Sequence, residues 1–198
     1  GQSGATRRDI RVFLEGSELD LGASVVLSAS QSHYLQKVMR VAEGSEIKVF
    51  DGSTGEWWCQ IETLGKKGAR GTITEHRREM VPEPDVWIMF AAVKGDGTDT
   101  IVQKATELGA RQLQAMTTQR SVVKAIRKER LEAIAIEAAE QCERLTAPPH
   151  VLNAAPLKQL LADWPRDRVL ILCDETSSQP PLAALASIPP HSPAALVV

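Results

Sequence analysis

The sequence has little of what marks several protein classes. Its three cysteines, Cys59, Cys142 and Cys173, are far apart and show neither a CxxC spacing nor a cysteine–histidine ligand pattern. This argues against a zinc site and against a disulfide framework, and it indicates a reducing, cytoplasmic location. No window approaches eighteen consecutive apolar residues, so we expect no transmembrane helix. The segment 1–11 lacks the apolar core of a secretory signal.

An excess of charge of one sign is also missing. The chain of 198 residues carries 23 basic and 25 acidic side chains, for a formal net charge of -2. A protein that holds nucleic acid by bulk charge is expected to be basic, so this balance counts mildly against such a role. One segment, 120–130, is nevertheless rich in cations, which is typical either of a phosphate-binding patch or of an ordinary solvated loop. Its basic residues are Arg120, Lys124, Arg127, Lys128 and Arg130.

The first eighty residues predict short strands with one short helix. The expected strands are 10–14, 24–27, 46–50, 56–61 and 71–76, and Ser30 is the expected N-cap of a helix that runs to about Arg40. Short strands joined by glycine turns are typical of a small β-barrel. Two prolines within 80–84 would stop a continuing strand, so we divide the chain into domains at 1–80 and 85–198.

The rest of the chain alternates between strands and helices. We expect strands at 86–93, 111–116, around Val151, at 169–173 and at 194–198, and helices at 98–108, 127–144, 157–163 and 182–185. This rhythm predicts the α/β class, with a mostly parallel sheet whose ligands bind outside the carboxyl ends of the strands. A buried strand seldom closes a domain, so the apolar segment at 194–198 suggests a fragment of a longer chain.

Several polar groups are placed where a site could form. Lys94 follows a buried strand and precedes a helix, which suits an anion although no P-loop or GxGxxG motif is present. Lys104 and Glu107 share one helix, and Glu137 lies on the next. Each is also explained by an ordinary turn or a solvated helix face. Spacing alone therefore predicts a two-domain protein with an anion site, without choosing a reaction.

Read as strings, these segments resemble one family. The motifs SHYLQKVMRV (32–41) and VFDGS (49–53) are similar to the RNA-binding, PUA-like domain of ribosomal RNA small subunit methyltransferase E. The motifs KGD, VQKATELG, QRSV and IAIEAAEQC, which fall between 94 and 142, resemble the start of its catalytic domain. The resemblance covers the chain from Arg11 onward, with the motifs in the family's order.

The resemblance implies a homodimeric enzyme of the SPOUT class. It would transfer methyl from S-adenosylmethionine to N3 of a uridine in 16S ribosomal RNA of the small subunit (m3U1498), without a metal. It also implies a C-terminal trefoil knot that holds the cofactor. The family's Gly-Pro-Glu-Gly-Gly loop and Arg-Leu-Arg-x-Glu-Thr-Ala segment do not occur in the sequence. We therefore expect the knot to be missing after Val198.

The resemblance further implies roles for individual residues. The cofactor would contact Leu172, Cys173, Asp174, Glu175 and Val198. The RNA would contact Arg11, His33, Arg40, Arg120 and Lys124. A uridine anion would be stabilised by Arg120, Lys94 or Lys104, and the base that removes the N3 proton would be Glu107 or Glu137.

Two other functions stay open from the sequence. One is a truncated RNA-binding or dimerising module that performs no chemistry. The other is an α/β enzyme for a small phosphorylated metabolite, which would use Lys94 and the helix beginning near Thr98.

Overall fold

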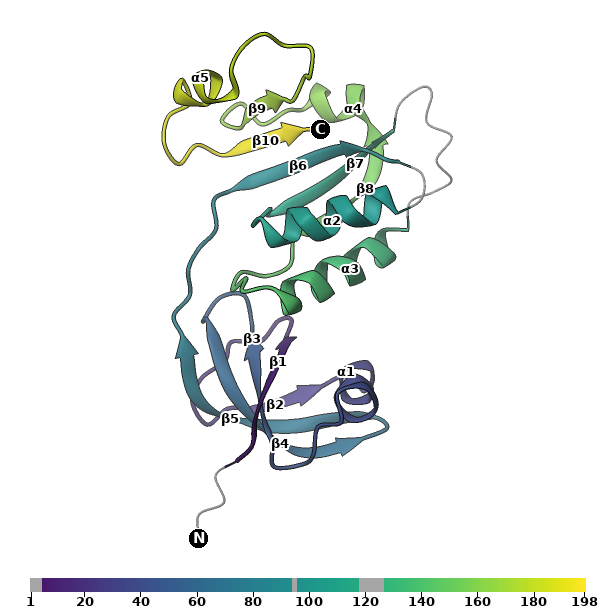
Figure 1. The fold of residues 1–198 in the computed structure, drawn as a ribbon, viewed down its shortest axis with the longest axis vertical. Helices are drawn as coiled ribbons and strands as arrows, with labels where there is room; N and C mark the ends of the chain where they lie inside the picture. Colours follow the sequence, from purple (N-terminus) through teal and green to yellow (C-terminus); the bar gives the residue numbers. More distant parts are fainter. Residues whose placement is uncertain (1–4, 94–95, 118–126) are drawn as a thin grey trace. The chain divides into compact units, whose positions relative to one another are not determined.

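The chain folds into two compact units, each with its own sheet (Figure 1). The computed structural model describes residues 5–93, 96–117 and 127–198. The first unit comprises Gly1–Pro82 and Glu143–Ala147, and the second comprises Glu83–Cys142 and Pro148–Val198. Strands and helices in both units confirm the mixed α/β class. Within the described ranges, no helix has the length and apolarity needed to cross a membrane.

The first unit holds a five-stranded sheet in the order β1-β3-β4-β5-β2. The strands are β1 (Arg7–Phe13), β2 (Ser24–Leu27), β3 (Glu46–Phe50), β4 (Glu56–Gly65) and β5 (Gly68–Arg78). Only the β1–β3 pair is parallel. Alternate strand residues such as Val25, Ile47 and Ile61 point into one apolar core, which also takes in Leu35. β4 and β5 are longer than predicted because they continue into the turn that joins them.

The helix of this unit begins earlier than predicted and changes its geometry. Ser28, not Ser30, is the N-cap of α1 (Ala29–His33), and it forms a capping box with Gln31. The chain then widens into a π-helix, η1 (Tyr34–Val38). Arg40 follows in the left-handed region, with a φ of 55°. The expected single α-helix to Arg40 is therefore wrong, since propensity does not predict a π turn.

The second unit holds a parallel sheet in the order β8-β7-β6-β10-β9, as the alternating pattern predicted. Its strands are β6 (Val86–Ala91), β7 (Gln112–Thr117), β8 (His150–Pro156), β9 (Val169–Leu172) and β10 (Ala194–Val197). Its helices are α2 (Gly97–Glu107), α3 (Lys128–Gln141), α4 (Leu157–Ala162) and α5 (Pro181–Ala186). Each bound lies close to the predicted one.

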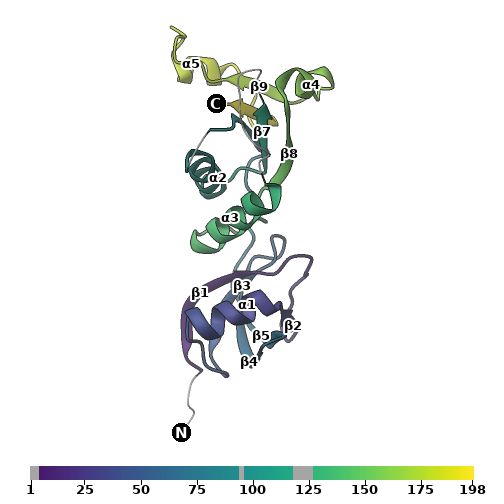
Figure 2. The ribbon, with the colours of Figure 1, turned by 90° about the vertical axis from the view of Figure 1, so that its right-hand side faces the viewer.

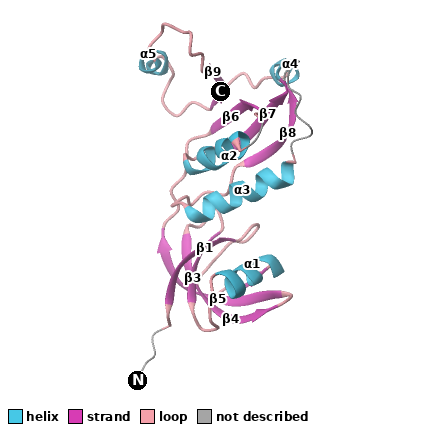
Figure 3. Cartoon of the chain, turned by 45° about the vertical axis from the view of Figure 1, so that its right-hand side comes forward, coloured by secondary structure: helices cyan, strands magenta, loops and turns pink. Residues whose placement is uncertain are grey.

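Helices cover the two faces of this sheet unequally. α2 and α3 bury one face around Phe90, Leu113 and Leu131. On the other face, α4 packs against the cluster of Met89, Met116 and Val197 (Figures 2 and 3). The short β10 lies in the interior of the sheet, between β6 and β9. This position brings the last strand of the chain beside the first strand of the unit.

Candidate functional site

The strand order of the second unit creates a candidate ligand edge. From β6 the chain proceeds to β7 and β8 on one side, whereas β10 and β9 lie on the other. In open parallel sheets, ligands bind outside the carboxyl ends at such a reversal. Here the amide of Val198 donates to the carbonyl of Met89 at 2.9 Å, and the amide of Cys173 donates to that of Val197 at 2.9 Å. The carboxyl ends of β6, β10 and β9 therefore lie side by side. We call this the switch edge.

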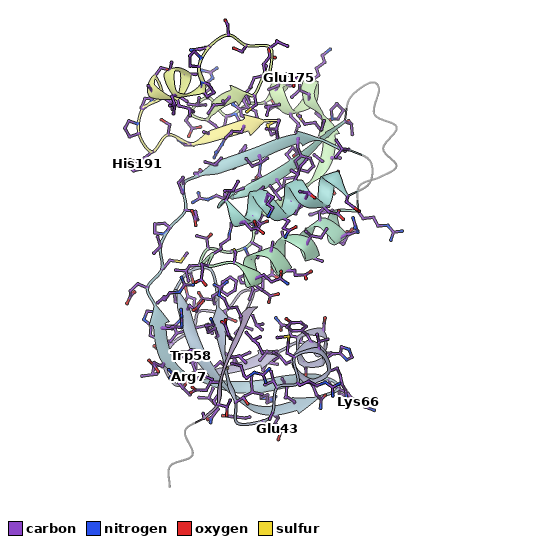
Figure 4. The ribbon with its side chains drawn as sticks, in the orientation of Figure 1. Arg7, Glu43, Trp58, Lys66, Glu175 and His191 are labelled. Atoms are coloured by element: carbon purple, nitrogen blue, oxygen red, sulfur yellow. The ribbon has the colours of Figure 1, made fainter. Side chains whose placement is uncertain are left out.

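The switch edge gathers all five residues predicted to hold a cofactor. Leu172 is 69% exposed and Val198 is 56% exposed, so both present apolar surface to solvent. Cys173, Asp174 and Glu175 follow β9 and are exposed (Figure 4 labels Glu175). The edge thus combines open apolar surface with two carboxylates.

Asp174 is held as an anion by its own loop. The Thr176 hydroxyl and the Thr176 amide donate to its Oδ1 at 2.7 and 2.9 Å. These hydrogen bonds keep the pKa of Asp174 below its ordinary value. The edge therefore carries a negative charge at neutral pH, which suits a cationic or hydroxyl-bearing ligand.

A buried arginine at the opposite end of the strands fixes the switch edge. The Arg168 guanidinium lies 3.6 Å from the ring centroid of Trp87, and its Nη2 is 2.8 Å from Oδ2 of Asp85. It also donates to the Ala194 carbonyl at 3.1 Å, while the Trp164 indole donates to the Arg168 carbonyl at 2.9 Å. These contacts join the beginnings of β6, β9 and β10. The sequence analysis missed Arg168, although a cation directly before an apolar strand was a usable signal.

The beginning of α2 is held by Thr98 and Asp99, which the sequence analysis did not select as site residues, and by Arg130, which it placed in the cation-rich segment 120–130. The Thr98 hydroxyl donates to the Val93 carbonyl at 3.0 Å and accepts from the Val93 amide at 3.2 Å. The next residue, Asp99, accepts two hydrogen bonds from Arg130, at 2.6 and 2.5 Å. This pair ties the beginnings of α2 and α3 together. A polar residue in the first turn after a buried strand was the available signal.

None of the predicted catalytic residues that the structure describes, Lys104, Glu107 and Glu137, lies at the switch edge. Lys94, Arg120 and, for RNA, Lys124 lie outside the described residues. Lys104 and Glu107 are exposed and pair with each other at 3.1 Å. α2 begins beyond the carboxyl end of β6, so Glu107 lies about 15 Å farther along the helix, toward the opposite end of the sheet.

Glu137 takes a similar position on α3. It is exposed, and its Oε1 accepts a hydrogen bond from Gln141 at 3.2 Å. α3 ends at Gln141, and the chain soon enters the amino end of β8. Glu137 is therefore on the part of the helix far from the switch edge, in the solvated pair that ordinary helix spacing predicts.

Arg11 is a buried residue of the first unit. Its Nε lies 2.6 Å from Glu56, its Nη2 donates to the Arg144 carbonyl at 2.6 Å, and its guanidinium lies 4.3 Å from the Phe50 ring centroid. Its side chain is 5% exposed. This burial does not fit the predicted contact with RNA.

His33 and Arg40 are exposed at the two ends of η1. Arg8 secures this turn by donating to the carbonyls of Met39 at 2.7 Å and Arg40 at 3.3 Å. The Arg40 carbonyl is thus engaged while its side chain stays in solvent. In 5–93, 96–117 and 127–198, no three potential metal ligands form a cluster.

Two family models match different parts of the chain. Residues 81–198 match the model of an RNA methyltransferase domain, and residues 27–74 match an RNA methyltransferase PUA domain.

Two curated relatives are both named ribosomal RNA small subunit methyltransferase E. The relative from Synechocystis is 39% identical over 137 residues, which is 68% of this chain and 44% of the relative. The relative from Bacillus subtilis is 29% identical over 188 residues, which is 90% of this chain and 73% of the relative. The chain thus spans less than half the length of the Synechocystis protein.

Two solved structures have similar folds. Ribosomal RNA small subunit methyltransferase E from Neisseria gonorrhoeae, bound to S-adenosyl methionine, gives a TM-score of 0.76 at 24% identity, covering 96% of this chain and 79% of that one. A Legionella pneumophila protein in complex with bound SAM gives a TM-score of 0.74 at 27% identity. The similarity covers 96% of this chain and 79% of the Legionella chain.

Proposed function

Because the chain belongs to the ribosomal RNA small subunit methyltransferase E family, we propose that it acts in methyl transfer from S-adenosylmethionine to N3 of a uridine in 16S ribosomal RNA (m3U1498). The observation that carries this proposal is the switch edge, where Leu172 to Glu175 meet Val198. The bound SAM of the Legionella structure supports the choice of cofactor. The proposal includes the small ribosomal subunit as substrate, a homodimer as the working form and the cytoplasm as the location.

The residues at the switch edge fit the proposed cofactor. Leu172 and Val198 would pack against the adenine, because both are apolar and open to solvent. The carboxylates of Asp174 and Glu175 would accept hydrogen bonds from ribose hydroxyls and attract the sulfonium charge, and Cys173 would lie beside them. When bound, S-adenosylmethionine supplies an electrophilic methyl group.

The reaction also needs charge stabilisation and a base. The N3 proton of uridine has a pKa well above neutrality, so it must leave while negative charge develops on O2 and O4. We assign the stabilisation of that charge to Arg120 and Lys94, by resemblance to the family. Lys104, Glu107 and Glu137 lie toward the far ends of their helices, and this geometry gives no support to either glutamate as the base.

The first unit would hold the RNA while a base is presented to the second. A base must be unpaired or turned out of its helix before its N3 is reachable. His33 and Arg40 would contact the RNA backbone, since both side chains are exposed beside η1.

Replacing Arg40 is expected to weaken RNA binding without changing cofactor binding. Arg40→Asn is the suitable variant, because asparagine tolerates the left-handed backbone that Arg40 adopts. Loss of one phosphate contact should lower the slope of log affinity against log salt by about 1. Filter binding of 16S ribosomal RNA and calorimetry with S-adenosylmethionine measure the two affinities. An equal loss of both would make Arg40 a structural residue instead.

The proposed reaction is tested by its product. The protein is incubated with S-adenosylmethionine and small ribosomal subunits that lack the modification, and the RNA is digested to nucleosides for mass spectrometry. The proposal predicts 3-methyluridine at the single site. RNA binding without any methylated nucleoside would favour the binding module without catalytic activity.

A further inference from the structure

Several charged residues on the sheet of the first unit form ion pairs with one another. Arg7 contacts Glu46 at 2.8 Å and also contacts Glu75, and Lys48 contacts Asp9. Figure 4 shows Arg7 beside Trp58, whose ring centroid lies 4.7 Å from the Arg7 guanidinium. Cations and carboxylates on these strands therefore largely cancel each other, which leaves little net field for a polyanion.

The side of the unit that carries α1 and η1 is different. Its exposed basic residues are His33, Lys37, Arg40, Lys66 and Lys67. Across the described part of the chain, none of these five side chains has an ion pair with a carboxylate. Their charge is therefore uncompensated by direct contact.

The helix and the hairpin turn form one continuous surface. Lys66 and Lys67 make up the turn between β4 and β5, and the Ser32 hydroxyl donates to the carbonyl of the adjoining Gly65 at 2.8 Å. Ser32 and Leu35 face inward, so the opposite side of the helix faces solvent. Figure 4 shows Lys66 at the tip of this hairpin. The helix–hairpin surface, as used below, is His33, Tyr34, Lys37, Arg40, Lys66 and Lys67.

Two further features bear on what this surface binds. Tyr34 is 40% exposed, so a flat aromatic ring lies among the cations. Glu43 is held away from the cations by a different contact: its Oε1 accepts a hydrogen bond from the Leu64 amide at 3.1 Å, and it forms no ion pair among the described residues. Cations that attract phosphates, together with an open ring that stacks on an unpaired base, are the features by which proteins hold RNA.

We infer that the helix–hairpin surface is an RNA-contacting face, and that Lys66 and Lys67 extend it from the helix onto the β4–β5 turn. The inference rests on the proposed function, since it takes ribosomal RNA as the partner. It assigns phosphate contacts to the two lysines and base stacking to Tyr34. A purely electrostatic partner, such as an acidic polypeptide, would use the lysines without the ring.

The test compares matched variants in the binding of 16S ribosomal RNA at several salt concentrations. Lys66→Ala/Lys67→Ala should weaken binding about tenfold near 0.1 M salt and reduce the salt slope by about 1 to 2. Tyr34→Leu should weaken binding about fivefold or more and leave the slope unchanged, because stacking releases no counterions.

Arg70→Ala is the control, because Arg70 is exposed on β5 but points away from the helix. Its neighbours Ala69 and Gly71 are buried toward the core that also takes in Leu35. Thermal melts confirm that each variant folds. If the wild-type chain binds no RNA, the proposed function fails. If the wild type binds RNA and the lysine or Tyr34 variants bind it as tightly as Arg70→Ala does, only the inference is overturned. Binding of poly-glutamate as tightly as RNA would also overturn the inference.

Discussion

Replacing Glu56 by alanine is expected to destabilise the first unit by about 3–5 kcal/mol, which is enough to unfold many domains. The Glu56 carboxylate is fully buried and lies between three guanidinium groups. Its contacts measure 2.6 Å to Arg11, 2.6 Å to Arg77 and 3.0 Å to Arg78. Without it, three guanidinium groups with like charges face one another, and the buried Arg11 loses a contact of 2.6 Å.

Unfolding in urea, with hydrogen exchange of the β4 and β5 amides as the probe, measures the loss of unfolding free energy for the first unit alone. The control is Glu62→Ala on the same strand, because Glu62 is exposed and accepts one hydrogen bond, from Thr72. That variant should stay within about 0.5 kcal/mol of the wild type. Similar stabilities for the Glu56 and Glu62 variants would contradict the assigned role.

The same residue predicts how the first unit responds to acid. Burial alone raises the pKa of Glu56, but hydrogen bonds and charges from Arg78 and Arg11 outweigh it and hold the pKa below its ordinary value of 4.5. A carboxylate whose pKa is lowered by folding stabilises the folded state fully when the pH is above its pKa in the unfolded chain. This stabilisation is lost as the pH falls through its pKa in the folded protein. Stability should therefore decline below about pH 4.5, and it should decline less in Glu56→Gln.

Replacing Arg168 by alanine is expected to cost the second unit about 3–5 kcal/mol, because it removes a desolvated cation–π contact with Trp87 together with charged hydrogen bonds to Asp85 and the Ala194 carbonyl. The Arg168 side chain is 8% exposed and lies 2.8 Å from Asp85. It is also the group that joins β6, β9 and β10 at their beginnings. The variant should accordingly bind the cofactor more weakly, through a loosened β9 and β10.

Arg111→Ala provides a control on the same carboxylate. Arg111 is 54% exposed and its Nη1 lies 3.4 Å from Asp85, so its loss should cost no more than about 1 kcal/mol. Denaturant unfolding, with exchange of β6 amides as the probe, compares the two variants. Equal losses in both would show that burial of Arg168 contributes nothing beyond an exposed ion pair.

Local sequence patterns predicted the elements of both units well, and for physical reasons. The apolar runs 86–91 and 169–172 and the alternation in 46–50 all predicted strands, because these patterns suit a sheet. Burial differs from what the patterns indicate: all five residues of 46–50 are buried, whereas Leu170 and Leu172 are exposed. The resemblance to the family, not spacing, selected Leu172 to Glu175 and Val198. These residues lie at the carboxyl ends of β9 and β10, where the rule for parallel sheets expects a ligand.

Features that depend on distant contacts were not predictable in the same way. The burial of Arg11 depends on Glu56 and on the Arg144 carbonyl, which lie 45 and 133 residues away. The position of β10 between β6 and β9 is a matter of strand order, on which local periodicity carries no information. The distances of Glu107 and Glu137 from the switch edge likewise follow from the direction of their helices, not from their spacing.

The most direct test of the account is a calorimetric titration of S-adenosylmethionine into the protein and two matched leucine variants. Leu172→Asp places a charge on the switch edge, whereas Leu108→Asp places the same charge at the far end of α2, where Leu108 is 86% exposed. Both leucines are open to solvent, so neither variant should unfold. The account predicts binding by the wild type and by Leu108→Asp, with a loss of about tenfold or more in Leu172→Asp. Equal affinities in the two variants would contradict it.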